Sequence, residues 1–137
     1  MILRRITCPA SQDASTAAYQ AVPSLTLYAA SKAFLLSFSR GLRYELKTTN
    51  VSVTCLSPGA TTTSFADRAG MGAELQATAN KVSMTAEAVA AFAVAGLLAG
   101  EAEIIPGMFN KVSAGLTSIV PKGIVEKIAA GIYEKYL

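Results

Sequence analysis

The sequence has no histidine and no tryptophan, and only 15% of its 137 residues are charged. Without histidine the chain cannot build a serine–histidine–aspartate triad or a cysteine–histidine pair, and it lacks the usual ligand of most zinc sites. Cysteine is scarce, and Cys8 and Cys55 do not have the spacing of a metal-binding or redox motif. We therefore expect both to be buried, reduced thiols of a cytoplasmic protein.

Long hydrophobic segments are also missing. The longest apolar run, residues 88–100, is too short to cross a bilayer as a helix of about 20 residues. The N-terminus lacks the sustained apolar core of a signal peptide after Arg4-Arg5, and this basic pair is too short for a nucleic-acid-binding patch. We expect no membrane span and no nucleic-acid partner.

The sequence does contain enough apolar material for one domain, because 52% of its residues are hydrophobic. The periodicity of these residues alternates between helical and strand spacing. We expect helices over residues 27–47, 86–99, 111–120 and 123–136, strands over 2–8, 51–56 and 103–106, a loop over 17–26 and a short helical lid within 61–83. Thr85 is the expected N-cap of the second helix and Gly100 its end.

Tyr28 and Lys32 carry the strongest chemical signal. Four residues apart on a helix, they project from the same face. At ~4 Å and an effective dielectric of about 20, an ammonium group attracts a phenolate by on the order of 4 kcal/mol before desolvation. Tyr28 is therefore a candidate general acid/base, and Lys32 is the group that tunes it. The alternative is an ordinary amphipathic pair near the start of a helix.

The residues around this pair make the alternative weaker. Ser15 lies thirteen residues before Tyr28, and the strand over 51–56 is followed by Pro58-Gly-Ala-Thr-Thr-Thr63. With these features the stretch from Ser15 to Phe65 resembles the second half of a short-chain dehydrogenase/reductase, a family of NAD(P)-dependent carbonyl reductases and alcohol dehydrogenases. The resemblance implies an α/β, Rossmann-like, doubly wound fold, of which this chain would hold the C-terminal part of the parallel sheet with its flanking helices.

The resemblance also implies catalytic roles. Ser15 would hydrogen-bond the reacting oxygen of a small carbonyl or alcohol substrate, and Tyr28 would exchange a proton with that oxygen. Lys32 would tune Tyr28 and hold the ribose hydroxyls of the nicotinamide, so that Tyr28 and Lys32 also line the cofactor site. Without the flanking matches, an ordinary amphipathic pair would be the preferred interpretation of Tyr28 and Lys32.

A second group of residues would contact the cofactor, NAD or NADP. Pro58 and Gly59 end a strand where a ligand can approach the backbone, and such strand ends line the cofactor crevice of open α/β sheets. By resemblance, the backbone of Thr61 would meet the nicotinamide carboxamide and the Thr63 hydroxyl would contact the amide or phosphate end. The alternative is a simple turn with threonines chosen for solvation.

The glycine-rich dinucleotide fingerprint of the family is absent. The run Gly70-Met-Gly-Ala-Glu-Leu75 has leucine where the third glycine belongs, and no strand precedes it. The resemblance also stops abruptly before Ser15. We therefore expect one partial domain over residues 1–137, with 1–14 foreign to the family, from a truncated or frame-shifted reading frame. Such a chain would bind the cofactor poorly and be weakly active or inactive, and it could form a homo-oligomer.

Two other functions remain open from the residues alone. One is a non-catalytic remnant or an interaction module that packs on a partner through exposed helices. The other is a protein that binds membrane surfaces through residues 123–136, with Lys122, Lys127 and Lys135 facing anionic lipid. The acidic residues Glu126 and Glu134 oppose that second function.

Overall fold

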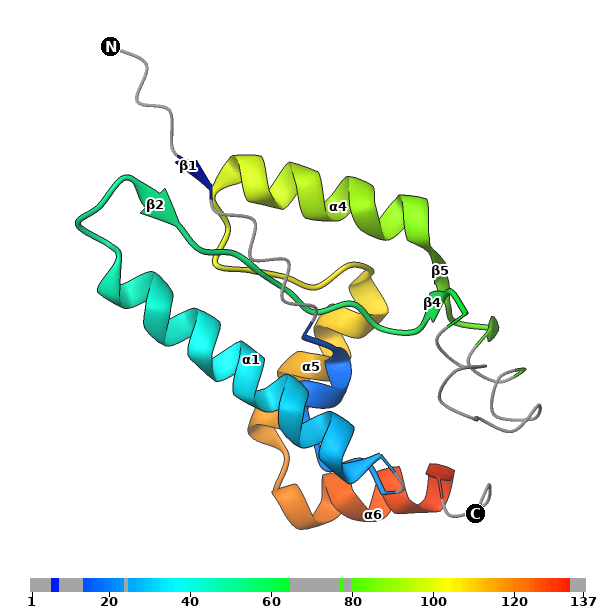
Figure 1. The fold of residues 1–137 in the computed structure, drawn as a ribbon. Helices are drawn as coiled ribbons and strands as arrows, with labels where there is room; N and C mark the ends of the chain where they lie inside the picture. Colours follow the sequence, from blue (N-terminus) through cyan, green and yellow to red (C-terminus); the bar gives the residue numbers. More distant parts are fainter. Residues whose placement is uncertain (1–5, 8–13, 24, 65–76, 78–79, 134–137) are drawn as a thin grey trace.

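The computed structural model describes residues 6–7, 14–23, 25–64, 77 and 80–133. Its elements, labelled as in Figure 1, are β1 (Ile6–Thr7), the 3₁₀ helix η1 (Thr16–Tyr19), α1 (Thr26–Glu45), β2 (Val51–Ser52), β3 (Cys55–Leu56), β4 (Thr61–Thr62), β5 (Met84–Thr85), α4 (Ala86–Ala99), β6 (Glu103–Ile104), α5 (Met108–Ile119) and α6 (Lys122–Tyr133). Cys8, most of the expected lid and the end of the last expected helix lie outside the described residues.

The described strands pair in parallel throughout, β1 with β2, β3 with β6 and β4 with β5. Parallel strands need long crossover connections, and the described ones contain α1 between β1 and β2 and α4 between β3 and β6, which confirms the expected α/β class. Figure 1 shows the extended segment of β2 and β3 between α1 on one side and α4 on the other. Contacts of α1 with β3 and of α4 with β6 agree with this layered arrangement.

The strand expected over 51–56 is two short strands with different partners. Between them, the Val53 carbonyl accepts a hydrogen bond from the Arg43 guanidinium at 2.6 Å, and the Thr54 hydroxyl donates to the Glu101 carbonyl at 2.7 Å. The same guanidinium donates to the Gly100 carbonyl at 2.7 Å. The Arg43 and Thr54 side chains therefore bond to backbone carbonyls that a continuous strand ladder would otherwise use. Arg43 also joins the end of α1 to the segments around Val53 and Gly100.

The long helices start and end close to where their sequence predicts. The Thr85 hydroxyl accepts a hydrogen bond from the Ala88 N–H at the start of α4, and Gly100 ends this helix with φ +73°, a conformation that glycine adopts without strain. Helix α1 ends two residues before Lys47, the expected last residue. The expected bounds of α4 and of α1 are therefore confirmed within the usual uncertainty of helix ends.

Three expectations need correction. The segment over 17–26 is not only loop, because most of the short helix η1 (Thr16–Tyr19), which Ser15 caps, lies within it. Helix α5 begins at Met108, three residues earlier than expected, directly after Gly107 with φ +85°. The strand expected over 103–106 ends at Ile104, because Pro106 has no N–H for a ladder.

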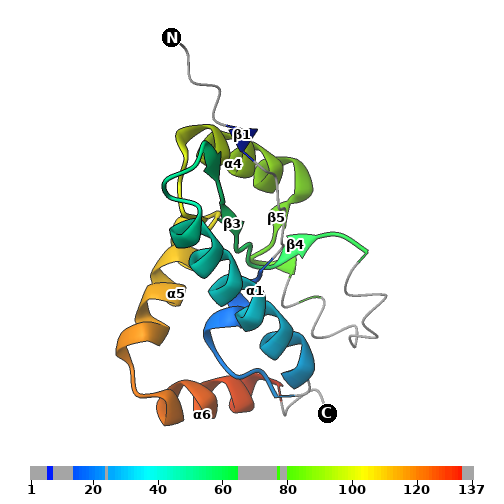
Figure 2. The ribbon, with the colours of Figure 1, turned by 60° about the vertical axis from the view of Figure 1, so that its left-hand side comes forward.

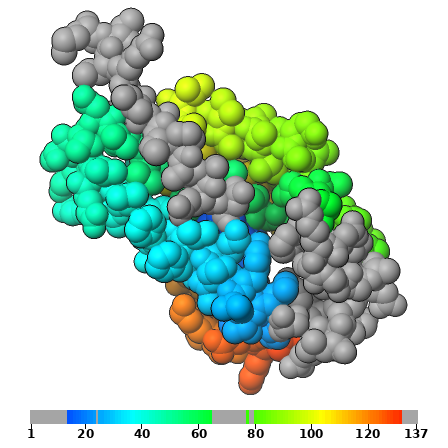
Figure 3. All heavy atoms as spheres, viewed as in Figure 1, coloured from blue at the N-terminus to red at the C-terminus, as the bar shows by residue number. Residues whose placement is uncertain are grey.

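The interior is built mainly from small side chains. A buried cluster of Ala14, Leu36 and Cys55 packs against Ala18 and Tyr19, and the Cys55 thiol is free and fully buried, as the sequence predicts. In the space-filling view, α4 (yellow-green) lies at one side of the molecule and α6 (orange to red) at the opposite side (Figure 3). Among the described helices, none combines the length and the apolarity that a membrane span requires.

Candidate active site

The candidate site begins where β3 ends. The chain continues through Ser57, Pro58 and Gly59, and the Pro58 carbonyl accepts a hydrogen bond from the Thr16 N–H at 3.0 Å. This bond holds the segment that begins at Ser15 against the strand end, although about forty residues of sequence separate them. Two of the predicted site segments, Ser15 and Pro58-Gly59, are therefore adjacent in the structure.

Ser15 is partly buried and caps η1, because its Oγ accepts a hydrogen bond from the Ala17 N–H at 3.2 Å. The sequence predicts a catalytic hydroxyl and does not predict this cap. The two roles are compatible, because the cap uses a lone pair of Oγ and leaves the O–H hydrogen outside that bond. The cap also fixes the side chain in one orientation, which a hydrogen-bond donor to substrate requires.

Tyr28 and Lys32 lie in the first two turns of α1, the helix that packs against η1 (Figure 2). The Lys32 Nζ lies 5.4 Å from the centroid of the Tyr28 ring, and both residues are partly buried. A second pair exists on the same helix, where the Lys47 Nζ lies 3.8 Å from the Tyr44 ring centroid. Contact between lysine and tyrosine is thus not specific to the site. What distinguishes Tyr28 is its position on the helix end beside η1.

The predicted cofactor residues after the end of β3 are in contact with other residues of the protein. The Thr61 hydroxyl donates to the Gly59 carbonyl at 3.1 Å, and Thr63 is exposed. A Cβ atom at Gly59 would lie 2.5 Å from the amide of Asn110, which in turn donates to the Pro106 carbonyl at 2.8 Å. The structure therefore gives a packing reason for this glycine, whereas the sequence pattern suggested the approach of a ligand. Asn110 itself was not predicted.

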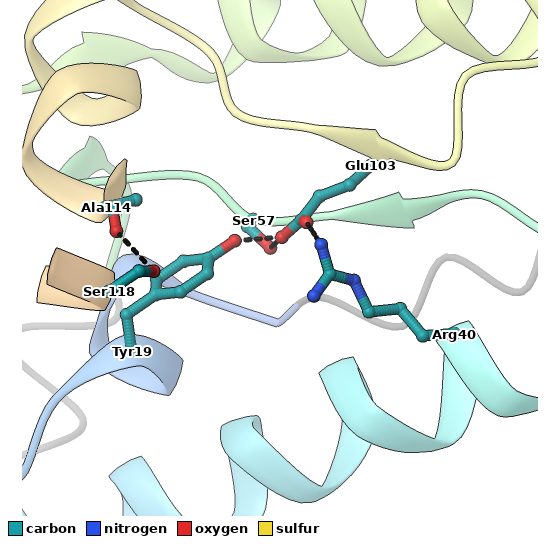
Figure 4. A network of polar contacts seen from close by, with 6 residues as sticks. All are labelled: Tyr19, Arg40, Ser57, Glu103, Ala114 and Ser118. Atoms are coloured by element: carbon teal, nitrogen blue, oxygen red, sulfur yellow. Dashed lines mark hydrogen bonds and ion pairs between the residues drawn. The ribbon is translucent and has the colours of Figure 1, made fainter. Parts of the chain in front are cut away.

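A carboxylate that the sequence did not single out joins the site together (Figure 4). Glu103 Oε1 accepts hydrogen bonds from the Tyr19 hydroxyl and, at 3.2 Å, from the Ser57 hydroxyl, and Glu103 Oε2 lies 3.0 Å from an Arg40 guanidinium nitrogen. Glu103 thus links η1, the end of β3 and α1. An acidic residue within an expected buried strand was the available signal, because a buried carboxylate needs partners.

Burial is the main cause of raised pKa values in this cluster. It raises the pKa of the Tyr19 phenol above its ordinary value, and the adjacent Glu103 carboxylate raises it further, while the hydrogen bond with Ser57 acts in the opposite direction. Burial likewise raises the pKa of the Cys55 thiol. Both groups therefore stay protonated in the folded state at pH values where the unfolded chain loses these protons.

We expect this difference to lower stability at alkaline pH. The ordinary pKa values are 10.0 for tyrosine and 9.0 for cysteine, and both groups have higher values when folded. The stabilisation is complete below about pH 9 and is lost as the pH rises further, because the unfolded state then binds fewer protons. The check is the urea midpoint between about pH 8 and pH 11. Tyr19→Phe should flatten the dependence of the urea midpoint on pH, and the exposed control Tyr44→Phe should not. If the wild type and both variants showed the same slope of midpoint against pH, burial of Tyr19 would not be the cause of the alkaline loss of stability.

A cavity of about 320 Å³ lies beside the start of α1. Its walls come from η1 with the residues after it, from the first turns of α1 and from α6, and they include Tyr19, three alanines of α1, Lys122 and Glu126. The alanines leave the space open because their side chains are short. The structure thus places an apolar cavity with two charged residues next to the helix turns that carry Tyr28 and Lys32.

Known proteins resemble the part of the chain that holds this site. The family model described as short chain dehydrogenase matches residues 13–74. Nodulation protein G of Rhizobium sp. (strain N33) is 32% identical over 99 residues, which are 71% of this chain and 40% of that protein. Dehydrogenase/reductase SDR family member 4 of Bos taurus is 49% identical over 51 residues, 37% of this chain and 18% of that protein.

A solved structure shows the same likeness in three dimensions. A short-chain dehydrogenase from Sphingobium yanoikuyae, in complex with NADPH, superposes with a TM-score of 0.61 and 26% sequence identity, over 79% of this chain and 44% of that one. These matches support membership of the short-chain dehydrogenase/reductase family. The chain spans about 40% of the length of the first curated relative. Residues 13–74 include every site residue that the sequence analysis named.

Proposed function

We propose that this chain carries the proton-transfer and nicotinamide side of an oxidoreductase site, which interconverts a carbonyl and an alcohol with NAD or NADP. The observation that supports the proposal is the convergence of three segments. The Thr16–Pro58 hydrogen bond holds the Ser15 segment at the end of β3, and η1 packs on the helix that bears Tyr28 and Lys32. The relationship to NAD(P)-dependent enzymes gives this geometry its chemistry.

In this proposal each residue has one task. Ser15 donates its hydroxyl hydrogen to the reacting oxygen and orients the substrate. Tyr28 gives its phenolic proton to that oxygen in the reducing direction and takes it back in the oxidising direction. Lys32 stabilises the negative charge that then remains on the Tyr28 oxygen. When bound, the nicotinamide supplies or accepts the hydride.

The residues that the family resemblance assigns to the nicotinamide end of the cofactor are present, and none is assigned to its pyrophosphate alone. At the strand end, the Thr61 hydroxyl lies beside Gly59, and the Asn110 side chain fills the space where a side chain at position 59 would lie. No Gly-x-Gly-x-x-Gly turn occurs anywhere in the sequence, so the chain has no recognisable pyrophosphate cradle. The adenine half of the cofactor therefore has no assigned partners in this chain.

We expect the purified 137-residue chain to bind NADPH weakly and to show no measurable reductase activity. Binding energy from the pyrophosphate and adenine is absent, and this energy is what holds a nicotinamide in position for hydride transfer. The measurement is isothermal titration with NADPH and with NADH, together with an absorbance assay of cofactor oxidation. Tight binding of either cofactor would show that this expectation is wrong.

A hybrid protein tests the proposed site itself. Residues 13–74 of this chain replace the structurally matching segment of the Sphingobium yanoikuyae dehydrogenase, which has been solved with NADPH. We expect the hybrid to reduce carbonyl substrates with NADPH. A folded hybrid that binds NADPH and turns over no carbonyl or alcohol would contradict the proposal and favour a non-catalytic segment.

A further inference from the structure

The cavity of about 320 Å³ lies on a different side of α1 from the catalytic candidate Tyr28. The α1 residues that line it are Thr26, Ala29, Ala30 and Ala33. At 100° per residue, these four lie about 100–200° around the helix from Tyr28, whereas Lys32 lies about 40° from it. Neither Tyr28 nor Lys32 is among the residues that line the cavity. The cavity is therefore separate from the pair to which we assign proton transfer.

Most of the cavity wall is apolar and made of short side chains. Five alanines line it, two from η1 and the segment that follows and three from α1, and Val125 of α6 closes the far side (Figure 2). The ring of Tyr19 forms one wall and is held in place, because its hydroxyl donates to Glu103. The volume falls at the lower end of the roughly 300–1,000 Å³ range of small-molecule sites. The space suits one aliphatic or aromatic group.

Two opposite charges line the same cavity. Lys122 and Glu126 lie one turn apart on α6, and both side chains contribute to the wall. Within the described part of the chain the ion pair is that of Arg40 with Glu103, so Lys122 and Glu126 are not paired with each other. Lysine preceding glutamate is also the less favourable order for such a pair on a helix. The wall thus presents one positive and one negative group, and each can bind an opposite charge.

Uncharged polar groups complete the wall. Gln20 is partly buried beside the cavity, and its side-chain amide makes no hydrogen bond to any residue that the structure describes. The Thr117 hydroxyl donates to the Ala114 carbonyl, which leaves its oxygen able to accept a second hydrogen bond. An amide and a hydroxyl oxygen therefore border the apolar space together with the two charges.

We propose that this cavity binds a free α-amino acid with a large apolar side chain. The ligand carboxylate pairs with Lys122, its ammonium group pairs with Glu126, and its side chain lies on the alanines. Residues four apart on a helix have Cβ atoms about 5–6 Å apart, so two charges carried by one carbon atom can reach both. The site does not depend on the proposed function, because it uses neither Ser15 nor Tyr28.

The charge pattern selects against simpler ligands. A carboxylate without an ammonium group would meet Lys122 but also the like charge of Glu126, and an amine without a carboxylate would meet the reverse situation. A neutral apolar molecule would fill the space and gain nothing from either charge. A zwitterion satisfies both groups at once, and this is the property that the test must isolate.

Three compounds of nearly the same shape isolate it. Isothermal titration of the full chain compares L-phenylalanine with 3-phenylpropanoate, which lacks the ammonium group, and with 2-phenylethylamine, which lacks the carboxylate. L-phenylalanine should bind with a roughly millimolar or lower Kd, as expected for a ligand of this size. Each of the other two should bind at least about tenfold more weakly, because a hydrogen bond between charged groups contributes at least that factor.

Variants locate the binding. Lys122→Gln should remove the preference for L-phenylalanine over 2-phenylethylamine, and Glu126→Gln should remove the preference over 3-phenylpropanoate. Ala33→Leu fills the cavity and should abolish binding of all three compounds. Lys127→Gln is the matched control, because Lys127 is exposed on the same helix and does not line the cavity. It should leave every affinity unchanged.

The comparison of the three compounds on the wild-type chain needs no variant to fold. Failure of L-phenylalanine to bind at about ten times the expected Kd overturns the proposal. Equal affinity for all three compounds also overturns it, because the cavity would then select only for an apolar group. Binding that Ala33→Leu and both charge variants leave intact places the ligand elsewhere and has the same consequence. None of these results bears on Tyr28, whose role is measured by turnover.

Discussion

Replacing Tyr28 by phenylalanine in the hybrid enzyme should lower kcat for carbonyl reduction by about 10²–10⁴-fold, the usual contribution of a general acid. Phenylalanine keeps the ring beside Lys32 and removes only the hydroxyl, so the fold and the cofactor site are preserved. We therefore expect the Kd for NADPH to change by less than about twofold. The measurement is steady-state kinetics together with cofactor titration of the same preparations.

The structure offers a matched control on the same helix. Tyr44 also has a lysine ammonium over its ring, at 3.8 Å, but it lies 69% exposed at the far end of α1. A Tyr44→Phe variant should therefore retain full turnover. If Tyr28→Phe also retained turnover, then the Tyr28–Lys32 pair would be an ordinary surface pair, and the catalytic assignment would be wrong.

Replacing Glu103 by alanine should lower the free energy of unfolding of the chain by about 3 kcal/mol, since hydrogen bonds to a charged group contribute about 1.5–3 kcal/mol each. The variant leaves the Tyr19 hydroxyl and the fully buried Ser57 hydroxyl without their acceptor. Arg40 adds little to the loss, because its side chain is 63% exposed and water replaces its partner. Urea unfolding at neutral pH measures the change.

Two variants control for this result. Glu101→Ala removes a nearby, exposed carboxylate and should change stability by less than about 0.5 kcal/mol. Glu103→Gln keeps an oxygen that can accept from Tyr19 and Ser57, so its loss should be clearly smaller than that of alanine. Equal stability of Glu103→Ala and the wild type would mean that this network does not hold η1 to the strand end.

The Glu103 network also connects stability with the proposed function. Through Tyr19 it holds η1, and η1 begins at the residue after Ser15. In the hybrid, which contains residues 13–74, an acceptor at the position equivalent to Glu103 would have to come from the host enzyme. Comparing hosts with and without a carboxylate there would separate the contribution of this anchor from that of the catalytic hydroxyls.

The parts of the molecule that depend on neighbouring residues were predicted from the sequence. The cap of α4 at Thr85 and its end at Gly100 follow from side-chain hydrogen bonding and backbone conformation within one helical turn. The same-face arrangement of Tyr28 and Lys32 follows from the helical period, and the burial of Cys55 follows from strand patterning. The catalytic roles of these residues remain predictions.

Other features depend on contacts between residues far apart in the sequence. The split of the strand over 51–56 required the Arg43 guanidinium and the Glu101 carbonyl to occupy positions beside it. The meeting of Ser15 with Pro58 required the Thr16–Pro58 bond, and Glu103 became a central anchor only because η1, β3 and α1 converge on it. No local pattern contains this information.

For this protein, then, the sequence by itself determined the helices, the α/β class and the candidate residues, because propensity, capping and spacing act over a few residues. The tertiary structure alone decided which strand segments pair, why Gly59 has no room for a side chain, and which face of α5 meets solvent. The apolar pattern of α5 predicts a helix with one buried side. Only the packing of the whole chain shows that the small side chains were the ones buried.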